Sequence, residues 1–142
     1  MSSFKTLRIN HIALVVGELD APLHFWRDGL GLALAQTEAV PEQQAEVAFL
    51  PVGESHVELV QPTTSDSGLA RFLAKRGPGM HHVCVEVDNI RAALAHLKGL
   101  GFRLIDETPR LGHAGRQYAF IHPESAQGVL VELYELPPAG SE

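Results

Sequence analysis

The chain has 142 residues, enough for one domain with a buried core, and 45% of them are hydrophobic. Its formal net charge of −6 at pH 7 argues against a nucleic-acid partner, because nucleic acids are bound by basic surfaces. A single cysteine excludes an internal disulfide, and no apolar stretch suits a membrane span or a signal peptide, so we expect a cytoplasmic protein with no membrane partner.

The first half of the chain predicts a strand, a helix and three further strands. In the strand at residues 11–16, His11 lies on the face opposite Ile12 and Leu14, because strand side chains alternate between faces. A helix is expected over Asp20–Asp28, with Asp20 as its N-cap. The later strands are expected at residues 32–34, 47–50 and 56–60, with residues 37–46 forming a loop or a ragged hairpin.

A linker and a short helix are expected at residues 62–78. The segment from Pro62 to Ser67 is rich in proline, threonine and serine, which is typical of a linker. Either Ser67 or Asp66 can cap the short helix, and Gly77-Pro78-Gly79 ends it.

The second half repeats the order of the first. A strand at residues 82–88 places His82 and Cys84 on the face opposite Val83 and Val85. A helix is expected over Asp88–Lys98, with Asp88 as its N-cap. The remaining strands are expected at residues 102–105, 117–122 and 128–136, and residues 137–142 are expected to form a frayed tail.

The repetition is visible in the residues themselves. NHIALVV matches HHVCVEV, and the final strand of each half contains the triplet Val-Glu-Leu, at residues 57–59 and 131–133. The prediction is therefore a single α+β domain with two tandem βαβββ modules, at about residues 7–61 and 79–136. Their strands would form a concave mixed sheet around a metal site, with the helices on the outer face.

Four side chains carry the expected chemistry: His11, Glu58, His82 and Glu132. A glutamate alone in a strand is more often a solvent-facing residue of a half-buried sheet. Here both halves place a histidine in the first strand and a glutamate in the last, on the face away from the helix. If the halves pair by a pseudo-two-fold axis, the four side chains can converge. Two imidazoles and two carboxylates suit divalent Mn, Co, Ni, Zn or Fe, with positions left open for catalysis.

The other histidines are interpreted differently. His24 and His96 are expected on helix surfaces, His56 at the edge of a turn, and His81 on the wrong face of its strand. His113 and His122 border loops near the final strands and could line a pocket.

At this point the chain resembles the vicinal oxygen chelate superfamily, whose paired βαβββ modules surround a divalent metal ion. Within it, residues 7–136 resemble the methylmalonyl-CoA epimerases. The more specific stretches are DSGLARFLAKRGPGMHH, and RLGHAG followed by AFIHP and GVLVEL.

The resemblance implies one divalent metal ion, Co, Mn, Ni or Zn, with His11, Glu58, His82 and Glu132 as its ligands. It implies interconversion of (2R)- and (2S)-methylmalonyl-CoA through an enolate, with Glu132 as a catalytic acid/base. It also implies an acyl-CoA substrate and a homodimer. A second acid/base glutamate of the family falls on Val47 here. The neighbouring Glu46 would face the other way, so no second residue is assigned.

Two alternatives remain open. Glyoxalase I also uses two histidines, two glutamates and a metal ion, so the ligand set cannot separate it from the epimerases. A drug-binding module of the bleomycin-resistance type is the non-catalytic alternative, although it has no need for four ligands. A ring-cleaving dioxygenase is less suitable, because it needs two histidines and only one carboxylate.

Overall fold

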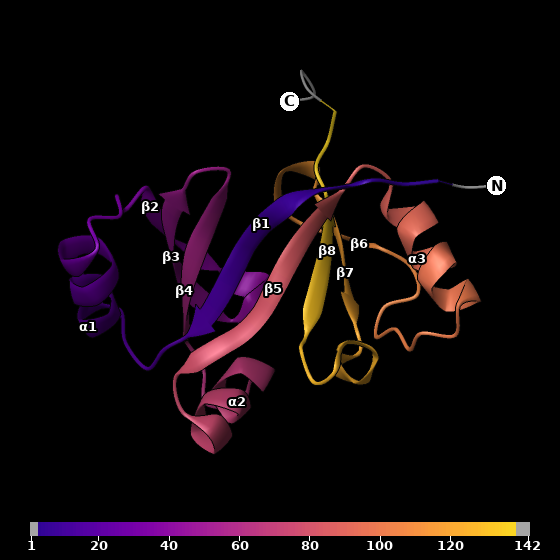
Figure 1. The fold of residues 1–142 in the computed structure, drawn as a ribbon. Coiled ribbons are helices and arrows are strands. Elements are labelled where there is room, and N and C mark those ends of the chain that lie inside the picture. The colour runs from indigo at the N-terminus through magenta and orange to yellow at the C-terminus, as the bar shows by residue number, and fades with distance from the viewer. Residues whose placement is uncertain (1–2, 139–142) are drawn as a thin grey trace. The chain divides into compact units, whose positions relative to one another are not determined.

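The computed structural model describes residues 3–138, which divide into two compact units (Figure 1). One unit comprises His11–His81, and the other comprises the residues up to Asn10 together with those from His82 onward. Each unit contains four strands and at least one helix, so the predicted α+β class with a repeated βαβββ order is confirmed. No helix among the described residues is long and apolar enough to cross a membrane.

The unit His11–His81 is a mixed sheet with strand order β2-β3-β4-β1. Its elements are β1 (Thr6–Val15, which begins in the other unit), α1 (Asp20–Leu23), the π-helical turn η1 (His24–Gly29), β2 (Gln36–Val40), the 3₁₀ turn η2 (Pro41–Gln43), β3 (Ala45–Val52), β4 (Ser55–Pro62) and α2 (Gly68–Arg76). β1 and β4 are parallel, whereas β3 pairs antiparallel with both β2 and β4.

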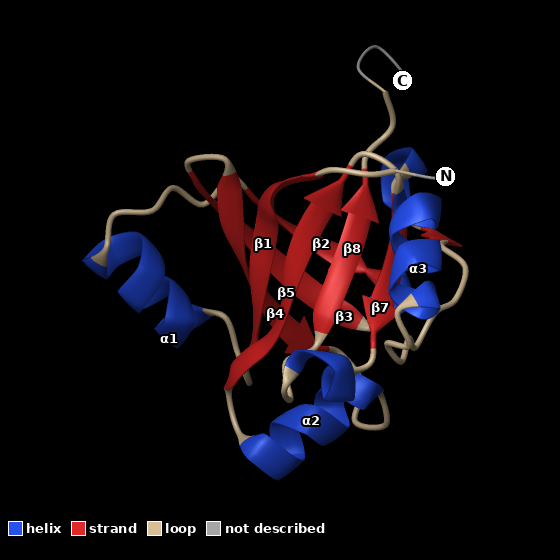
Figure 2. Ribbon diagram, turned by 45° about the vertical axis from the view of Figure 1, so that its right-hand side comes forward, coloured by secondary structure: helices blue, strands red, loops and turns tan. Residues whose placement is uncertain are grey.

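The first helix, α1, lies beside the strands of this sheet (Figures 1 and 2), and apolar side chains hold it against one face. Leu23 and Trp26 of the helical segment pack with Ile12 and Leu14 of β1 and with Leu59 of β4. These strand residues are the ones that alternation assigns to the helix face, so the predicted orientation of β1 is confirmed. Burial of such side chains contributes about 1.5–3 kcal/mol each, which fixes the face that each strand turns toward the helix.

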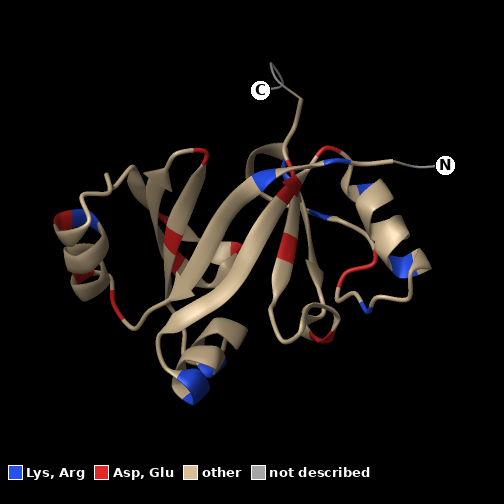
Figure 3. Cartoon of the chain, in the orientation of Figure 1, with Lys and Arg blue, Asp and Glu red and all other residues tan. Residues whose placement is uncertain are grey.

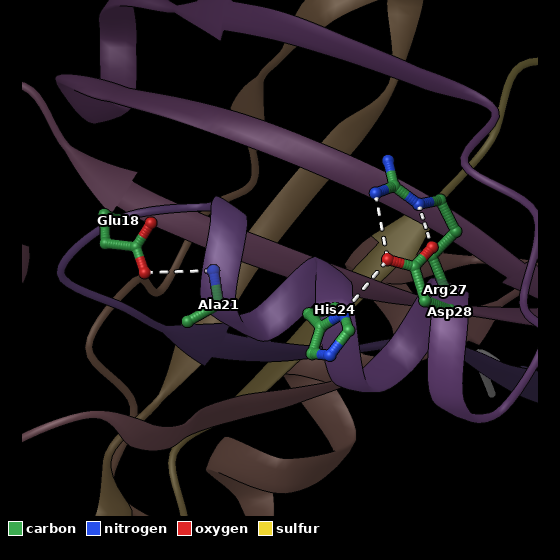
Figure 4. A network of polar contacts seen from close by, with 5 residues as sticks. All are labelled: Glu18, Ala21, His24, Arg27 and Asp28. Carbon is green, nitrogen blue, oxygen red and sulfur yellow. Dashed lines mark hydrogen bonds and ion pairs between the residues drawn. The ribbon is translucent and has the colours of Figure 1, made fainter.

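The start of α1 differs from the prediction that Asp20 caps it. The helix begins at Asp20 itself. Glu18 accepts hydrogen bonds from the backbone N–H of Asp20 at 2.8 Å and from that of Ala21 at 3.0 Å, and Figure 4 shows the second of these bonds. The first amides of a helix have no carbonyl partner within the helix. Leu19, the residue before the helix, already has helical dihedral angles and forms no side-chain cap, and the carboxylate of Glu18 accepts these amides instead. At the other end, Asp28 contacts His24 at 3.2 Å and Arg27 at 2.8 Å.

The other unit has the strand order β5-β8-β7-β6. Its elements are β5 (Gly79–Val87), α3 (Ile90–Gly99), β6 (Arg110–Leu111), the 3₁₀ turns η3 (His113–Gly115) and η4 (Pro123–Ala126), β7 (Gln117–Ile121) and β8 (Val131–Glu135). β5 and β8 are parallel, and β7 is antiparallel to β8. Ile90 and Leu94 of α3 pack with Val85 and Leu133, so this helix also lies on one face of its sheet.

The cap of α3 is Asn89, not Asp88 as predicted. The Asn89 side chain accepts a hydrogen bond from the N–H of Ala92 at 3.1 Å, and its backbone is extended. Asp88 instead accepts the N–H of Lys5 at 2.7 Å. The two residues are equally good caps in isolation, and the pairing of Asp88 with the N-terminal segment decides between them. The predicted cap of α2 is confirmed at Ser67, which accepts from Ala70 at 3.1 Å.

Two predicted strands are wrong. Residues 32–34 form no strand, because the N–H of Leu32 donates to the carbonyl of Trp26 at the end of the helical segment. β2 begins only at Gln36 and pairs antiparallel with β3, which confirms the ragged hairpin predicted for residues 37–46. Residues 102–105 contribute only an isolated bridge between Leu104 and Ile121, and the edge strand β6 comes later. Of the predicted tail, residues 139–142 lie outside the described residues.

Candidate functional site

A buried histidine–glutamate pair joins β1 and β4 in the unit His11–His81. His11 lies in register with His56, and Ala13 with Glu58, so His11 and Glu58 are diagonal neighbours on one face. Nδ1 of His11 is 3.2 Å from Oε2 of Glu58. His11 is 1% exposed and Glu58 6%, so this carboxylate is almost removed from solvent.

A second pair joins β5 and β8 in the other unit. Cys84 lies in register with Glu132, which makes His82 and Glu132 diagonal neighbours in the same way. Nε2 of His82 is 3.0 Å from Oε1 of Glu132, and the residues are 8% and 3% exposed. Each unit thus contains one imidazole paired with one carboxylate between its two parallel strands.

Both pairs lie on the face of their sheet opposite the first helix of each half, α1 in one unit and α3 in the other. Glu58 lies between Val57 and Leu59, which pack on the helix side, and Glu132 stands beside Leu133, which does the same. The residue in register with each glutamate is small and fully buried, Ala13 in one unit and Cys84 in the other. A small neighbour leaves room for the carboxylate. Glu58 is the only Asp, Glu, Lys or Arg residue in β4, and Figure 3 draws the acidic residues of the chain in red.

The donor atoms of each pair fit a divalent metal ion. Histidine nitrogens and carboxylate oxygens bind first-row ions at about 2.0–2.2 Å, so two such donors at a right angle lie about 3 Å apart. The separations of 3.2 and 3.0 Å have this value. A buried carboxylate also favours a nearby cation, because an unpaired charge is costly away from water.

His56, which the sequence predicted only at the edge of a turn, also contacts the pair of His11 and Glu58. Its Nε2 is 2.8 Å from Oε2 of Glu58, and its ring stacks on that of His11 with centroids 5.1 Å apart. His11, His56 and Glu58 form a group with donor atoms all within 4.8 Å of one another. Alternation alone could have indicated this, since His56 and Glu58 are two residues apart in one strand.

The remaining histidines have other surroundings. His24 is exposed and pairs with Asp28, the ring of His96 packs on Phe4, and the ring of His81 packs edge-on against Phe72. His122 accepts the N–H of Glu124 at 3.0 Å and so caps a 3₁₀ turn, and His113 begins another such turn. The pocket role suggested for His113 and His122 stays a prediction.

The position of the family's second glutamate is apolar in this fold. Val47 is buried with Ala13 and Val60 on the face that carries Glu58. Glu46 is exposed on the opposite face. Glu46 therefore points away from the site, as strand alternation predicted.

The chain is similar to known proteins over most of its length. Residues 10–120 match the model of the glyoxalase/bleomycin resistance protein/dioxygenase superfamily. The chain is 40% identical over 131 residues to a mitochondrial methylmalonyl-CoA epimerase of Mus musculus, covering 92% of this chain and 74% of that protein. It is 34% identical over 131 residues to an ethylmalonyl-CoA/methylmalonyl-CoA epimerase of Cereibacter sphaeroides, covering 91% and 98%. A solved methylmalonyl-CoA epimerase in complex with methylmalonyl-CoA and NH4+ matches with a TM-score of 0.85 at 33% identity, covering 97% of this chain and 99% of that one.

A lactoylglutathione lyase is a more distant relative. The protein from Salmonella typhimurium is 28% identical over 134 residues, covering 94% of this chain and 96% of the lyase. The glyoxalase alternative is thus less similar to this chain than the epimerases are.

Proposed function

We propose that this chain, which belongs to the glyoxalase/bleomycin resistance protein/dioxygenase superfamily, is an enzyme that epimerises (2R)- and (2S)-methylmalonyl-CoA. The comparisons support this reaction over the glyoxalase reaction, since epimerases match at 33–40% identity and the lyase at 28%. The structural observation that carries the proposal is the pair of buried imidazole–carboxylate contacts at equivalent register positions of the two units.

The proposed ligands of one divalent metal ion are His11, Glu58, His82 and Glu132. Their matched positions in the two halves and the separation of the donor atoms within each pair support this assignment. A divalent cation bound there would act as a Lewis acid that stabilises negative charge on the thioester oxygen. The two carboxylates would balance the charge of the ion. Co, Mn, Ni and Zn all suit this mixture of nitrogen and oxygen donors.

Glu132 is the proposed proton-transfer group. The substrate carries an acidic C–H between a thioester and a carboxylate, and a base must remove this proton from C2. The carboxylate of Glu132 is 3% exposed, so water competes little for it, and His82 holds one of its oxygens in place at 3.0 Å. Positioned general bases of this kind contribute about 10²–10⁴-fold to the rate. Return of a proton to the opposite face of the enolate completes the inversion.

The test is an assay of the purified, metal-loaded protein on one epimer of methylmalonyl-CoA. Formation of the other epimer, with deuterium at C2 when the reaction runs in D₂O, is the expected result, because the enolate takes its proton from groups that exchange with solvent. The methylglyoxal–glutathione hemithioacetal is assayed in parallel. Turnover of the hemithioacetal without epimerisation would assign the glyoxalase reaction instead.

An oligomeric state also belongs to this proposal. By resemblance, the protein acts as a homodimer. Light scattering during size-exclusion chromatography should give twice the 15.4 kDa mass of the chain. A mass of one chain at micromolar concentration would contradict the dimer without affecting the proposed reaction.

A further inference from the structure

His56 lies where it can control the orientation of the Glu58 carboxylate. Its Nε2 is 2.8 Å from Oε2 of Glu58, closer than the 3.2 Å that separates the same oxygen from Nδ1 of His11. A nitrogen–oxygen contact of this length to an ionised carboxylate is a charge-assisted hydrogen bond with the proton on the nitrogen. His11 and His56 thus contact the same carboxylate oxygen, Oε2 of Glu58.

Strand pairing fixes the position of His56 rigidly. It lies in register with His11 across the parallel strands β1 and β4, and two residues before Glu58 in β4. Its ring is held between the rings of His11, at 5.1 Å, and Phe49, at 5.7 Å. Its side chain is 25% exposed, whereas that of Glu58 is 9% exposed. The donor thus comes from a ring that is packed on both sides and reaches a nearly buried carboxylate.

The other unit has no equivalent histidine. The residue two positions before Glu132 is Leu130, which cannot donate a side-chain hydrogen bond. The two halves therefore share the imidazole–carboxylate pair but differ in the group beside the carboxylate. His56 is therefore not part of the histidine–glutamate pattern that the two halves repeat.

We propose that His56 is a positioning residue that orients Glu58 for metal binding. A carboxylate oxygen has two lone-pair directions. The N–H of His56 uses one of them and leaves the other for the ion that Glu58 shares with His11. This inference rests on the metal site proposed above. Groups that orient a metal ligand in this way typically change affinity by about 10- to 100-fold when they are removed.

The experiment compares His56→Phe with His56→Gln. Phenylalanine keeps the ring packing against His11 and Phe49 but removes the donor, whereas the side-chain amide of glutamine can replace it. Affinity for Co²⁺ is measured by competition with a chromophoric chelator, and the melting temperature of each metal-free variant is recorded. We expect His56→Phe to bind Co²⁺ about 10- to 100-fold more weakly and His56→Gln to recover most of the loss. His24→Phe, an exposed histidine on the helix side, is the matched control and should bind as the wild type does.

A double-mutant cycle with Glu58→Ala, which removes the oxygen that His56 contacts, shows whether His56 acts through this carboxylate. In the Glu58→Ala background, His56→Phe should weaken Co²⁺ binding little further. Equal affinity of the wild type and His56→Phe would overturn the inference and leave the epimerase proposal intact. An equal loss in both backgrounds, or no recovery with glutamine, would also overturn it. If the wild type itself binds no Co²⁺, the proposed metal site fails together with this inference.

Discussion

Three glutamates are buried among residues 3–138, and the partner of each one determines what it can do. Glu86 is bound by the guanidinium of Arg8 at 2.7 Å and the amide of Asn10 at 3.3 Å, a permanent cation and a neutral donor. Glu58 and Glu132 are instead contacted by imidazoles, and imidazole is a common ligand of metal ions in proteins. A buried carboxylate needs a compensating charge or hydrogen bond. We therefore interpret Glu86 as structural, and the other two as the carboxylates of the proposed metal site.

At this scale, the Glu132→Gln substitution tests the proton transfer. Glutamine keeps an oxygen that can bind a metal ion but cannot accept the proton of C2. We expect metal to be partly retained while turnover falls by at least about a hundredfold. Steady-state epimerisation, together with metal analysis of the purified variant, checks this.

The matched control for Glu132→Gln is Glu46→Gln. Glu46 is exposed on the face of β3 opposite to Glu58, so this substitution should leave turnover at the wild-type rate. Full activity in Glu132→Gln would move the proton transfer to another residue. A strong loss in Glu46→Gln would show that a carboxylate outside the buried pairs takes part.

At the scale of single elements, the helix starts depend on one side chain each. Asn89 accepts the N–H of Ala92 at the start of α3, while Asp88 is paired with Lys5. Removing an N-cap leaves a helical amide without its partner and costs about 1 kcal/mol, within a range of roughly 0.5–2. Asn89→Ala should therefore lower the free energy of unfolding by about this amount.

Urea denaturation of Asn89→Ala and Asp88→Ala in parallel measures that difference. Asp88→Ala removes an exposed hydrogen bond outside the helix, so its effect should be the smaller of the two. A larger effect of Asp88→Ala would mean that Asp88 is the cap in solution.

The end of the first helical segment has a predictable pH dependence. The hydrogen bond from Arg27, and next that from His24, lowers the pKa of the Asp28 carboxyl. A carboxyl with a lowered pKa in the folded protein stabilises it above the unfolded pKa, about 3.9, and this contribution disappears as pH falls through the folded value.

Asp28→Asn should therefore melt below the wild type at neutral pH, and the difference should begin to shrink near about pH 4 and vanish only below the lowered folded pKa of Asp28. Thermal melts of both proteins across this range check it. Because the pair is exposed, added salt should also reduce the difference at neutral pH. A difference that grows on acidification would contradict the assignment.

At the scale of the whole molecule, metal binding should contribute to stability. A ligand that binds only the folded state stabilises it by about 2.7 kcal/mol at a hundredfold excess over its dissociation constant. Chelation should thus lower the melting temperature of the whole protein, and Co²⁺ or Mn²⁺ should restore it. The double variant His11→Ala His82→Ala is the control, because its melting temperature should respond to neither treatment. An unresponsive wild type would remove the metal from the proposed function.

The sequence by itself determined the faces on which the key side chains lie. Alternation is a property of each strand's own backbone, so it placed His11 opposite Ile12 and Leu14, and Glu58 opposite Val57 and Leu59, without knowledge of any partner. The repeated Val-Glu-Leu triplet then indicated two equivalent modules. Their βαβββ order and the helix on one face of each sheet agree with the structure.

Only the tertiary structure decided which residues meet across strands. The contact of His11 with Glu58 and the stacking of His56 on His11 depend on the register of β1 and β4, whose paired residues are 45 positions apart in the chain. Asn89 rather than Asp88 caps α3 because Asp88 accepts the backbone N–H of Lys5. The edge strand near residue 110 depends on its pairing with β7. Register and pairing between distant segments follow from the free energy of the whole core, whereas alternation follows from the local backbone, and this is why the sequence alone could not supply them.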